Sequence, residues 1–194
     1  MTQVSDIKDV TNRTAFEGLQ VTSTGSQVSN NPTELIVQGT PGNDTLYGGL
    51  ANELLMGGGG FDYMNSGGGN DILVGGAGGV YMNGGAGNDV FRFDHISDSY
   101  INAAGERTGF IDYFDPVQDI LDVSALGYTH LGNGYGDSLH LRSEPRRGIY
   151  ILESYEQGHN GQRFAVQLKS RSFSDALSRR TRGLHVAVQN CQQP

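Results

Sequence analysis

The chain has 194 residues, of which 30 are glycine and one is cysteine, and its 21 acidic and 13 basic side chains give a net charge of −8 at pH 7. One cysteine excludes a disulfide framework or a cysteine-ligated zinc or iron–sulfur site within the chain. No apolar run approaches the roughly 18 residues of a membrane helix, and the negative charge argues against binding to duplex nucleic acid. We therefore expect neither membrane insertion nor a nucleic-acid partner.

Charge and glycine are unevenly distributed along the chain. Residues 1–139 hold 17 of the acidic and 4 of the basic side chains, whereas residues 140–194 hold 4 acidic and 9 basic ones. Eighteen of the glycines lie between positions 39 and 92, together with recurring apolar residues. A flexible linker would lack these apolar residues, and collagen would need glycine at every third place, so neither class fits.

A period of nine residues organises the glycine-rich segment. Read from Gly39, it gives GTPGNDTLY, GGLANELLM, GGGGFDYMN, SGGGNDILV, GGAGGVYMN and GGAGNDVFR. The eighth place is apolar in all six repeats: Leu46, Leu55, Met64, Leu73, Met82 and Phe91. The sixth place is acidic in five of them, namely Asp44, Glu53, Asp62, Asp71 and Asp89, with Val80 in the remaining repeat. This is the nonapeptide pattern of a calcium-binding parallel β-helix.

The spacing explains why such repeats make metal sites. Each nonapeptide predicts about six turn residues, where glycine permits positive φ, followed by three strand residues with the middle side chain inward. Two nonapeptides then make one coil, and residues 18 apart stack on strands about 4.8 Å apart. Stacked carboxylates repel unless a cation lies between them, and calcium accepts oxygen ligands at about 2.3–2.6 Å. Calcium is therefore the expected cofactor.

Pairing residues 18 apart ranks the expected calcium sites. Asp44 with Asp62 and Asp71 with Asp89 are complete aspartate pairs. A third site pairs Asp71 with Glu53, whose side chain is one methylene longer. A fourth pair would join Asp62 to Val80 and lacks one carboxylate, so it is expected to be weak or empty.

The outward strand residues differ between odd and even repeats, which lie on opposite faces. The even face carries Leu54, Met56, Ile72, Val74, Val90 and Arg92, and we expect this apolar face to be covered. The odd face carries Thr45, Tyr47, Tyr63, Asn65, Tyr81 and Asn83. Tyrosine and asparagine rows are able to contact sugar rings; the alternative is that they are ordinary exposed strand residues.

The segment after the repeats contains further acids and strand patterns. Residues 109–128 carry Asp112, Asp115, Asp119 and Asp122 around an Asp-Pro turn, which predicts two short strands that cap the roll. Asp115, Asp119 and Asp122 are candidates for a further calcium ion, with surface or turn-capping roles as the alternative. Residues 149–153 and 163–168 predict a hairpin across a polar loop.

The motifs resemble a known family. The repeats resemble the RTX secreted calcium proteins, and the continuation FRFDHISDSY, IDYFDPVQDILDVSALGY, LGNGYGDSLHL and GQRFAVQL is similar to the R-modules of bacterial mannuronan C5-epimerases. The resemblance spans about residues 39–170. It implies an all-β fold, a right-handed parallel β-roll with a C-terminal β capping region. It also implies a secreted, extracellular module beside a catalytic A-module that converts mannuronate to guluronate within alginate, with export through a type I secretion exporter.

The resemblance also sets the expected organisation of the chain. We expect an N-terminal segment or linker (1–38), six calcium-binding repeats (39–92), the C-terminal part of the module (93–170) and a basic tail that is a candidate secretion signal (171–194). The catalytic module of the family has a Tyr-Gly-Phe-Asp-Pro-His-type motif, and here Phe114-Asp115-Pro116 is followed by Val117. We therefore expect this chain not to be the catalyst, although it resembles part of an isomerase.

Alginate or mannuronan is the expected polysaccharide partner. The carbohydrate-binding candidates are Tyr47, Tyr63, Tyr81, Asn65 and Asn83 on the odd face and the cations Arg142, Arg146 and Arg163. The alternative is a secretion and folding module of another RTX exoprotein (protease, lipase or toxin type) without sugar affinity. In either case the expected mechanism is folding driven by calcium, because uncompensated carboxylates and glycine-rich turns disfavour the ordered chain at low calcium.

Overall fold

The computed structural model of the chain describes residues 22–23, 26–28, 36–102, 104–144, 147–156, 161–170 and 185–187. Within these ranges it contains strands and two short 3-10 helices, η3 (Ile96–Asp98) and η4 (Ser124–Leu126), which confirms an all-β fold. No described helix is long and apolar enough to cross a membrane. The strands are β1 (Thr22–Ser23), β2 (Ser26–Val28), β3 (Ile36–Gln38), β4 (Thr45–Tyr47), β5 (Leu54–Asn65), β6 (Ile72–Asn83), β7 (Val90–Arg92), β8 (Tyr100–Ile101), β9 (Gly109–Asp112), β10 (Ile120–Asp122), β11 (His130–Leu131), β12 (Ser138–Glu144), β13 (Ile149–Glu153), β14 (Arg163–Lys169) and β15 (His185–Ala187).

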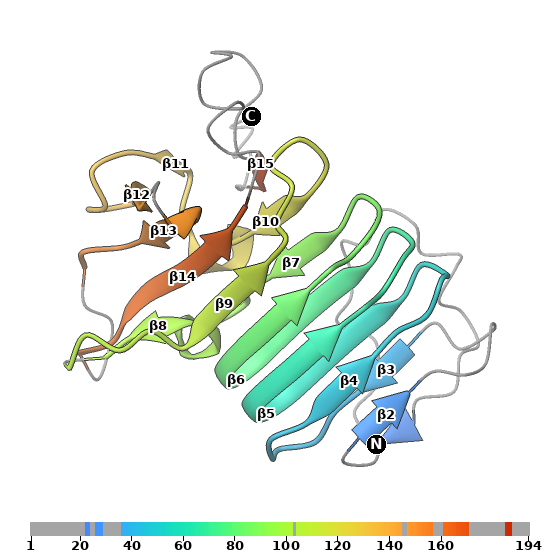
Figure 1. Cartoon of the computed structure of the whole chain (residues 1–194). Coiled ribbons are helices and arrows are strands. Elements are labelled where there is room, and N and C mark those ends of the chain that lie inside the picture. The colour runs from blue at the N-terminus through green and yellow to red at the C-terminus, as the bar shows by residue number, and fades with distance from the viewer. Residues whose placement is uncertain are drawn as a thin grey trace, which may run out of the picture.

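The nonapeptide segment forms a parallel β-roll in which residues 18 apart are neighbours (Figure 1). β5 and β6 pair from Leu54 opposite Ile72 to Asn65 opposite Asn83. Each of these strands is 12 residues long because it contains two three-residue strands and the turn between them. The same offset joins β3 and β4 to β5, and β6 to β7. The structure therefore confirms that two nonapeptides make one coil.

The apolar side chains at the eighth place of each repeat fill the inside of the roll. All six are fully buried: Leu46, Leu55, Met64, Leu73, Met82 and Phe91 each have 0% exposure. They belong to one hydrophobic cluster that also includes residues beyond the repeats. Burying a side chain of this size contributes about 2 kcal/mol. This contribution offsets the large conformational entropy that the glycine-rich turns lose on folding.

Two strands after the last repeat continue the two sheets of the roll. β9 pairs with β6, with Phe110 opposite Tyr81, and β10 pairs with β7, with Leu121 opposite Phe91. The two short strands predicted around the Asp-Pro turn are thus present. They are not paired with each other, since each extends a different sheet.

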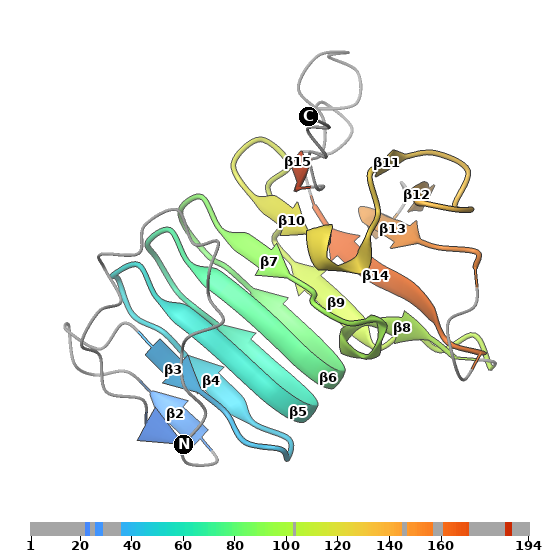
Figure 2. The same ribbon diagram turned by 180° about the vertical axis from the view of Figure 1, so that it is seen from behind.

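A three-stranded antiparallel unit follows and joins the roll through β14. β13 lies between β12 and β14, which confirms the predicted hairpin of residues 149–153 and 163–168. β14 also pairs in parallel with β9, with Gln167 opposite Phe110, so one sheet is continuous from β5 through β6, β9 and β14 to β12. Figure 2 shows this C-terminal β region at the end of the roll opposite to β2 and β3.

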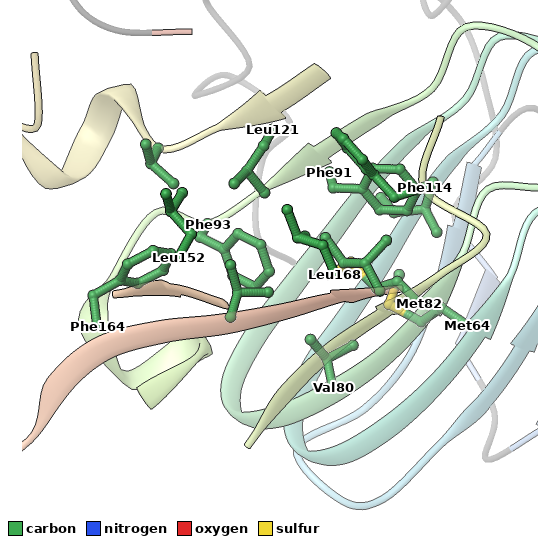
Figure 3. Packing of buried hydrophobic residues seen from close by; sticks show 14 of the residues in the cluster. Met64, Val80, Met82, Phe91, Phe93, Phe114, Leu121, Leu152, Phe164 and Leu168 are labelled. Atoms are coloured by element: carbon green, nitrogen blue, oxygen red, sulfur yellow. The ribbon is translucent and has the colours of Figure 1, made fainter. Parts of the chain in front are cut away.

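The hydrophobic core continues from the roll into the C-terminal β region without a break (Figure 3). The ring centroids of Phe91 and Phe114 lie 5.8 Å apart, and those of Phe93 and Phe164 lie 5.7 Å apart at an interplanar angle of 70°. Phe91 is the last eighth-place residue, whereas Phe164 comes from β14. The two parts therefore stabilise each other through a shared core.

Strands near both chain ends pair with the roll. β1 and β2 pair in parallel with β3 and β4, and β15 pairs in parallel with β10, with His185 opposite Ile120. The candidate secretion tail thus contributes backbone to the even sheet. The other residues of the predicted segments 1–38 and 171–194, apart from residues 36–38, lie outside the described residues.

The apolar outer face of the even repeats is covered in part. Leu54 is 1% exposed, as is Ile36 beside it on β3. The other outward residues of this face are half-buried: Met56, Ile72, Val74, Val90 and Arg92. As expected, Leu54 is covered, whereas the other outward residues of the even face are covered only in part.

Candidate functional site

The sixth-place acids are joined into ladders by hydrogen bonds across the coils. In each pair the backbone N–H of the earlier acid donates to one carboxylate oxygen of the later acid. The distances are 2.9 Å from Asp44 to Asp62, 2.8 Å from Glu53 to Asp71 and 3.0 Å from Asp71 to Asp89. Asp44 and Asp62 form what we call the short ladder. Glu53, Asp71 and Asp89 begin the long ladder on the other side of the roll.

Asp119 adds a further step to the long ladder. The N–H of Asp89 donates to Oδ1 of Asp119 at 3.1 Å, although the two residues are 30 positions apart in sequence. The second oxygen of Asp119 accepts the N–H of Asp115 at 2.8 Å. Asp119 is 4% exposed and stands directly before β10, as the sixth-place acids stand before their strands. The long ladder therefore runs through Glu53, Asp71, Asp89 and Asp119.

The other two acids predicted after the repeats have local roles. Oδ1 of Asp115 accepts the N–H of Val117 at 2.9 Å, which closes the Asp-Pro turn. Oδ1 of Asp122 accepts the N–H and the hydroxyl of Ser124 at 3.0 and 2.6 Å at the start of η4. The structure thus brings Asp119 into the ladder and gives Asp115 and Asp122 turn-capping contacts.

Four of the ladder carboxylates have one oxygen that is buried and has no hydrogen-bond partner among the described residues. These atoms are Oε2 of Glu53 and Oδ2 of Asp62, Asp71 and Asp89. A buried acceptor without a partner costs free energy, so such atoms call for an explanation. A bound cation supplies one.

The turn glycines hold backbone carbonyl oxygens close to these free carboxylate oxygens. A Cβ on Gly57 would clash with the carbonyl oxygen of Gly75 and with Oδ2 of Asp62. A Cβ on Gly84 would clash in the same way with Oδ2 of Asp89. Carboxylate and carbonyl oxygens are the hard donors that calcium prefers. Within the described residues, no three His, Cys, Asp or Glu side chains converge on one metal position, so backbone oxygens are needed to complete a calcium shell.

Burial raises the pKa values of the ladder carboxyls. The pKa rises to about 7 for Glu53 and to about 6 for Asp62, and in both cases the neighbouring acid adds to the effect of burial. The pKa of Asp89 rises to about 7 and that of Asp119 to about 6 for the same two reasons. Without a cation these sites therefore disfavour the charged form, and a divalent ion reverses that preference.

The short ladder ends at Val80 because this residue belongs to the hydrophobic core. Val80 is 0% exposed and lies among the core side chains in Figure 3. Its N–H donates to the carbonyl oxygen of Thr108 at 2.9 Å, where the chain enters β9. A Cβ on Gly79 would lie 3.0 Å from Cδ2 of Phe61, so the ring of Phe61 occupies the space beside the fifth place. The missing carboxylate thus coincides with the point where β9 joins the sheet.

The tyrosines of the odd face form a stacked row, which we call the tyrosine row (Tyr47, Tyr63 and Tyr81). Ring centroids lie 6.1 Å apart between Tyr47 and Tyr63 and 5.1 Å apart between Tyr63 and Tyr81, the latter with planes 9° apart. Phe110 continues the row, 5.2 Å from Tyr81. Tyr47 and Tyr63 are 39% and 36% exposed, and Tyr81 is half-buried. Asn65 stands beside them, half-buried.

The row ends at a buried carboxylate and a lysine. The hydroxyl of Tyr81 donates to Oδ2 of Asp112 at 2.6 Å, and Nζ of Lys169 lies 3.1 Å from Oδ1 of the same side chain. Burial alone would raise the pKa of Asp112, but the Tyr81 hydroxyl and the Lys169 ammonium lower it overall. Lys169 also lies 5.6 Å from the ring centroid of Tyr113, which is 57% exposed and has a φ of 56°. Oδ1 of Asn83, opposite Asp112, is buried without a partner among the described residues.

Two of the candidate arginines, Arg142 on β12 and Arg163 on β14, lie on C-terminal strands away from the tyrosine row. Nε of Arg142 lies 3.5 Å from the buried carboxylate of Glu153, and its Nη1 lies 3.6 Å from Glu144. Arg163 lies over the ring of Tyr155, with 5.9 Å from Cζ to the centroid. Arg146 lies outside the described residues. The structure therefore brings the three tyrosines together and places Lys169 at the end of their row.

Sequence patterns do not show that Lys169 and Tyr113 lie next to the tyrosine row. Both lie next to Asp112 only because β9 and β14 pair in parallel, far apart in sequence. The sequence does indicate which face these side chains occupy, because inward and outward side chains alternate along β9 and β14 and this alternation puts Asp112 and Lys169 on the outer face. The register between these strands was not readable from the sequence.

Comparison with known proteins places these features in a family. The family model of the RTX calcium-binding nonapeptide repeat (four copies) matches residues 36–64 and 65–94. The solution structure of the AlgE6R2 subunit of the Azotobacter vinelandii mannuronan C5-epimerase is 42% identical, with a TM-score of 0.61 over 71% of this chain and 84% of that one. The AlgE6R3 subunit is 43% identical, with a TM-score of 0.55 over 66% of this chain and 71% of that one.

Full-length relatives are much longer than this chain. Mannuronan C5-epimerase AlgE6 from Azotobacter vinelandii is 44% identical over 88 residues, which are 45% of this chain and 10% of that protein. Mannuronan C5-epimerase AlgE3 is 42% identical over 79 residues, 41% of this chain and 4% of that protein. Alginate lyase 7 from the same organism is 37% identical over 86 residues, 44% of this chain and 10% of that protein. The match thus spans a tenth or less of each of these relatives.

Proposed function

The chain belongs to the calcium-binding RTX R-modules of the mannuronan C5-epimerases. From this membership we propose that it is a secreted accessory module. It folds on binding calcium and then binds alginate for a separate catalytic module. One observation carries the calcium part of the proposal. Four ladder carboxylates, those of Glu53, Asp62, Asp71 and Asp89, each have one buried oxygen without a hydrogen-bond partner among the described residues. The proposed ligands are Glu53, Asp71, Asp89 and Asp119 on one side and Asp44 and Asp62 on the other.

Calcium binding and folding are coupled because the ladder is stable only when its charge is neutralised. Stacked carboxylates in a low-dielectric interior repel each other, and the glycine-rich turns lose much entropy on ordering. At the low calcium of a cytoplasm these costs leave the repeats unfolded, which suits passage through a type I exporter. Extracellular modules bind calcium at about 0.1–1 mM, so folding follows outside the cell.

Circular dichroism with calcium and with excess chelator tests the coupling. We expect the β signal and the cooperative thermal transition to be lost in chelator and restored by calcium. Magnesium at the same concentration is the control, because it demands shorter bonds and octahedral geometry and gives up its water reluctantly. An unchanged spectrum and melting temperature in chelator would refute calcium-coupled folding.

The tyrosine row and Lys169 form the proposed alginate contact. Aromatic faces pack against sugar rings. The side chain of Lys169 is 47% exposed, so its ammonium attracts uronate carboxylates while staying paired with Asp112. Bound calcium would also reduce the negative potential of the roll. Two kinds of alginate enzyme, an epimerase and a lyase, carry segments similar to this chain, which supports a module that acts through the shared polymer.

Calorimetry of the calcium-loaded chain with oligomannuronate tests this contact. We expect saturable heat with the uronate and none with a neutral β-linked oligosaccharide. Lys169→Gln is expected to weaken binding about tenfold, which corresponds to ~1.4 kcal/mol. Arg147→Gln is the matched control, since the side chain of this arginine is 76% exposed and its ion pair among the described residues is with Glu144. Equal binding by the wild type and the Lys169 variant would contradict this role of Lys169.

The ion pairs of the C-terminal strands favour a second candidate, a secretion and folding module without sugar affinity. Arg142 is held by Glu153 and Glu144, and Lys169 by Asp112, so their positive charge is already compensated in part. Under this alternative the calcium-folded chain gives no heat with any uronate. Unchanged secretion of an attached exoprotein when the tyrosine row is replaced would agree with it.

A further inference from the structure

A cluster of three aromatic rings and one arginine lies in the C-terminal β region, apart from the ladders and the tyrosine row. Tyr155 is at its centre, with ring centroids 5.5 Å from Tyr135 and 5.4 Å from His140. The guanidinium carbon of Arg163 lies 5.9 Å from the Tyr155 centroid. We call these four residues the Tyr155 cluster.

Hydrogen bonds fix the loop that carries Tyr135. The carbonyl oxygen of Gly134 accepts the N–H of Tyr155 at 2.6 Å, and the hydroxyl of Ser138 donates to the carbonyl oxygen of Tyr135 at 2.7 Å. Gly134 has a φ of 86°, and a Cβ there would lie 2.8 Å from Cδ2 of Tyr155. The loop therefore needs glycine to approach the Tyr155 ring, and it presents Tyr135 in one defined position.

The exposed ring and the arginine are both available to a ligand. Tyr135 is 58% exposed, so its ring is not held there by burial. No described carboxylate lies within ion-pair distance of Arg163. Glu156, the acid that contacts this loop, accepts the N–H of Gly136 at 2.9 Å. The surface thus combines an aromatic face with a cation that forms no ion pair with a described carboxylate.

The Tyr155 cluster and the tyrosine row lie on the same face of one continuous sheet. Arg163 and Gln167 are four residues apart on β14 and so point to the same side. Gln167 is opposite Phe110 on β9, and Phe110 is opposite Tyr81 on β6. Strand spacing and rise place the Cα atoms of Arg163 and Tyr81 roughly 16 Å apart. Several linked pyranose rings span such a distance.

We propose that the Tyr155 cluster is a second binding subsite that takes an acidic pyranose unit of the same chain that contacts the tyrosine row. The sugar ring packs on the exposed face of Tyr135, and its carboxylate accepts hydrogen bonds from Arg163. This inference rests on the proposed binding of alginate. It predicts that affinity rises with chain length, because a polymer that reaches both subsites binds the second one at high effective concentration.

A single tryptophan at position 135 reports directly on this subsite. The chain contains no tryptophan, so Tyr135→Trp gives a fluorescence signal from this loop alone. We expect long oligomannuronate to change that fluorescence saturably in calcium, and a neutral β-linked oligosaccharide to leave it unchanged. Tyr63→Trp provides the same readout for the tyrosine row. Circular dichroism in calcium establishes that each variant is folded.

Substitutions separate the second subsite from the first. Tyr135→Ala and Arg163→Gln are expected to weaken binding of long oligomannuronate about tenfold and to leave the affinity of a short oligomer for the tyrosine row unchanged. Leu131→Ala, at the end of β11 just before this loop and 42% exposed, is the control and is expected to change neither. If the folded variants bind long oligomers as the wild type does, while Tyr63→Ala abolishes binding, the second subsite is overturned and the proposed function stands. If the folded wild type binds no uronate of any length, both are overturned.

Discussion

The backbone N–H of Asp71 donates a 3.0 Å hydrogen bond to Oδ1 of Asp89, and Oδ2 of Asp89 is buried without a partner among the described residues. Asp71 itself repeats this arrangement, since its Oδ1 accepts the N–H of Glu53 at 2.8 Å and its Oδ2 is free. Asp71 and Asp89 are therefore each tied to the acid before and to the acid after them in the long ladder. A calcium ion beside one carboxylate also stabilises its neighbours.

Asp71→Asn is expected to weaken calcium binding more than Asp44→Asn does. Asp71 lies between two acids of the long ladder, whereas Asp44 is the first acid of the short ladder and has one acidic neighbour in it. The Oδ2 atom of Asp44 already accepts the N–H and the hydroxyl of Thr40 at 2.6 and 2.9 Å. Removing a charged ligand costs about 1.5–3 kcal/mol, so roughly tenfold or more of affinity is lost per site. A calcium titration followed by circular dichroism measures both variants. Equal losses would contradict the stacking.

Asp119→Asn is expected to lower calcium affinity and the melting temperature in calcium, because Asp119 is the last acid of the long ladder. Asp122→Asn is the matched control, three residues further on, where the side chain caps η4. We expect this control to leave calcium affinity unchanged and to change stability little, because the amide oxygen of asparagine still accepts the hydrogen bonds of Ser124. The contrast is measured by thermal melts over a series of calcium concentrations. A larger loss of affinity in the Asp122 variant would exclude Asp119 as a ligand.

The repeat architecture was predictable because residues within each nine-residue repeat determine it. The nine-residue period fixes which residues form turns and strands, and from it follow the 18-residue register of β5 and β6 and the burial of Met64 and Met82. The pairing of Asp44 with Asp62 follows from the same arithmetic.

The features beyond the repeats depend on contacts between distant segments. Asp119 was named among the acids after the repeats, but its place above Asp89 depends on a 30-residue connection that leaves through η3 and returns to β10. The sequence does not show which cation lies beside the tyrosines, and the pairing of β14 with β9 brings Lys169 there. The position of Tyr135 depends on turns at Gly134 and Gly136, whose φ values a sequence pattern does not specify.

Val80→Asp is expected to destabilise the protein and not to create a calcium site below Asp62. Although it restores the repeat pattern, Val80 is fully buried in the core and its neighbour Thr108 begins the entry to β9. An unpaired buried charge costs about 3–5 kcal/mol. Val80→Ala, the control for lost packing alone, is expected to cost less. Chemical denaturation in saturating calcium measures both, and full stability of the aspartate variant would show that the fourth site forms.

The stability of the calcium-free chain is expected to fall as the pH rises from 5 to 8. Burial raises the pKa of Glu53 and Asp89 to about 7 and that of Asp62 to about 6, above the usual values of carboxyl groups. A group whose pKa is raised in the folded state stabilises that state fully below its unfolded pKa, and the contribution is lost as the pH rises through the folded pKa. In excess chelator, residual structure should therefore be greatest near pH 5.

Saturating calcium is expected to reverse this pH dependence. The ion binds the deprotonated carboxylates, so protons compete with it and stability rises with pH through the same interval. At fixed ionic strength, thermal melts give the slope in calcium, and the β signal of circular dichroism gives the pH dependence of the residual structure in chelator. Asp89→Asn removes one carboxyl whose pKa is raised and should flatten both slopes, whereas Asp137→Asn, at an exposed site outside the ladders, should change neither. A calcium-free stability that increases from pH 5 to 8 would mean that the ladder carboxyls are not stacked in the apo chain.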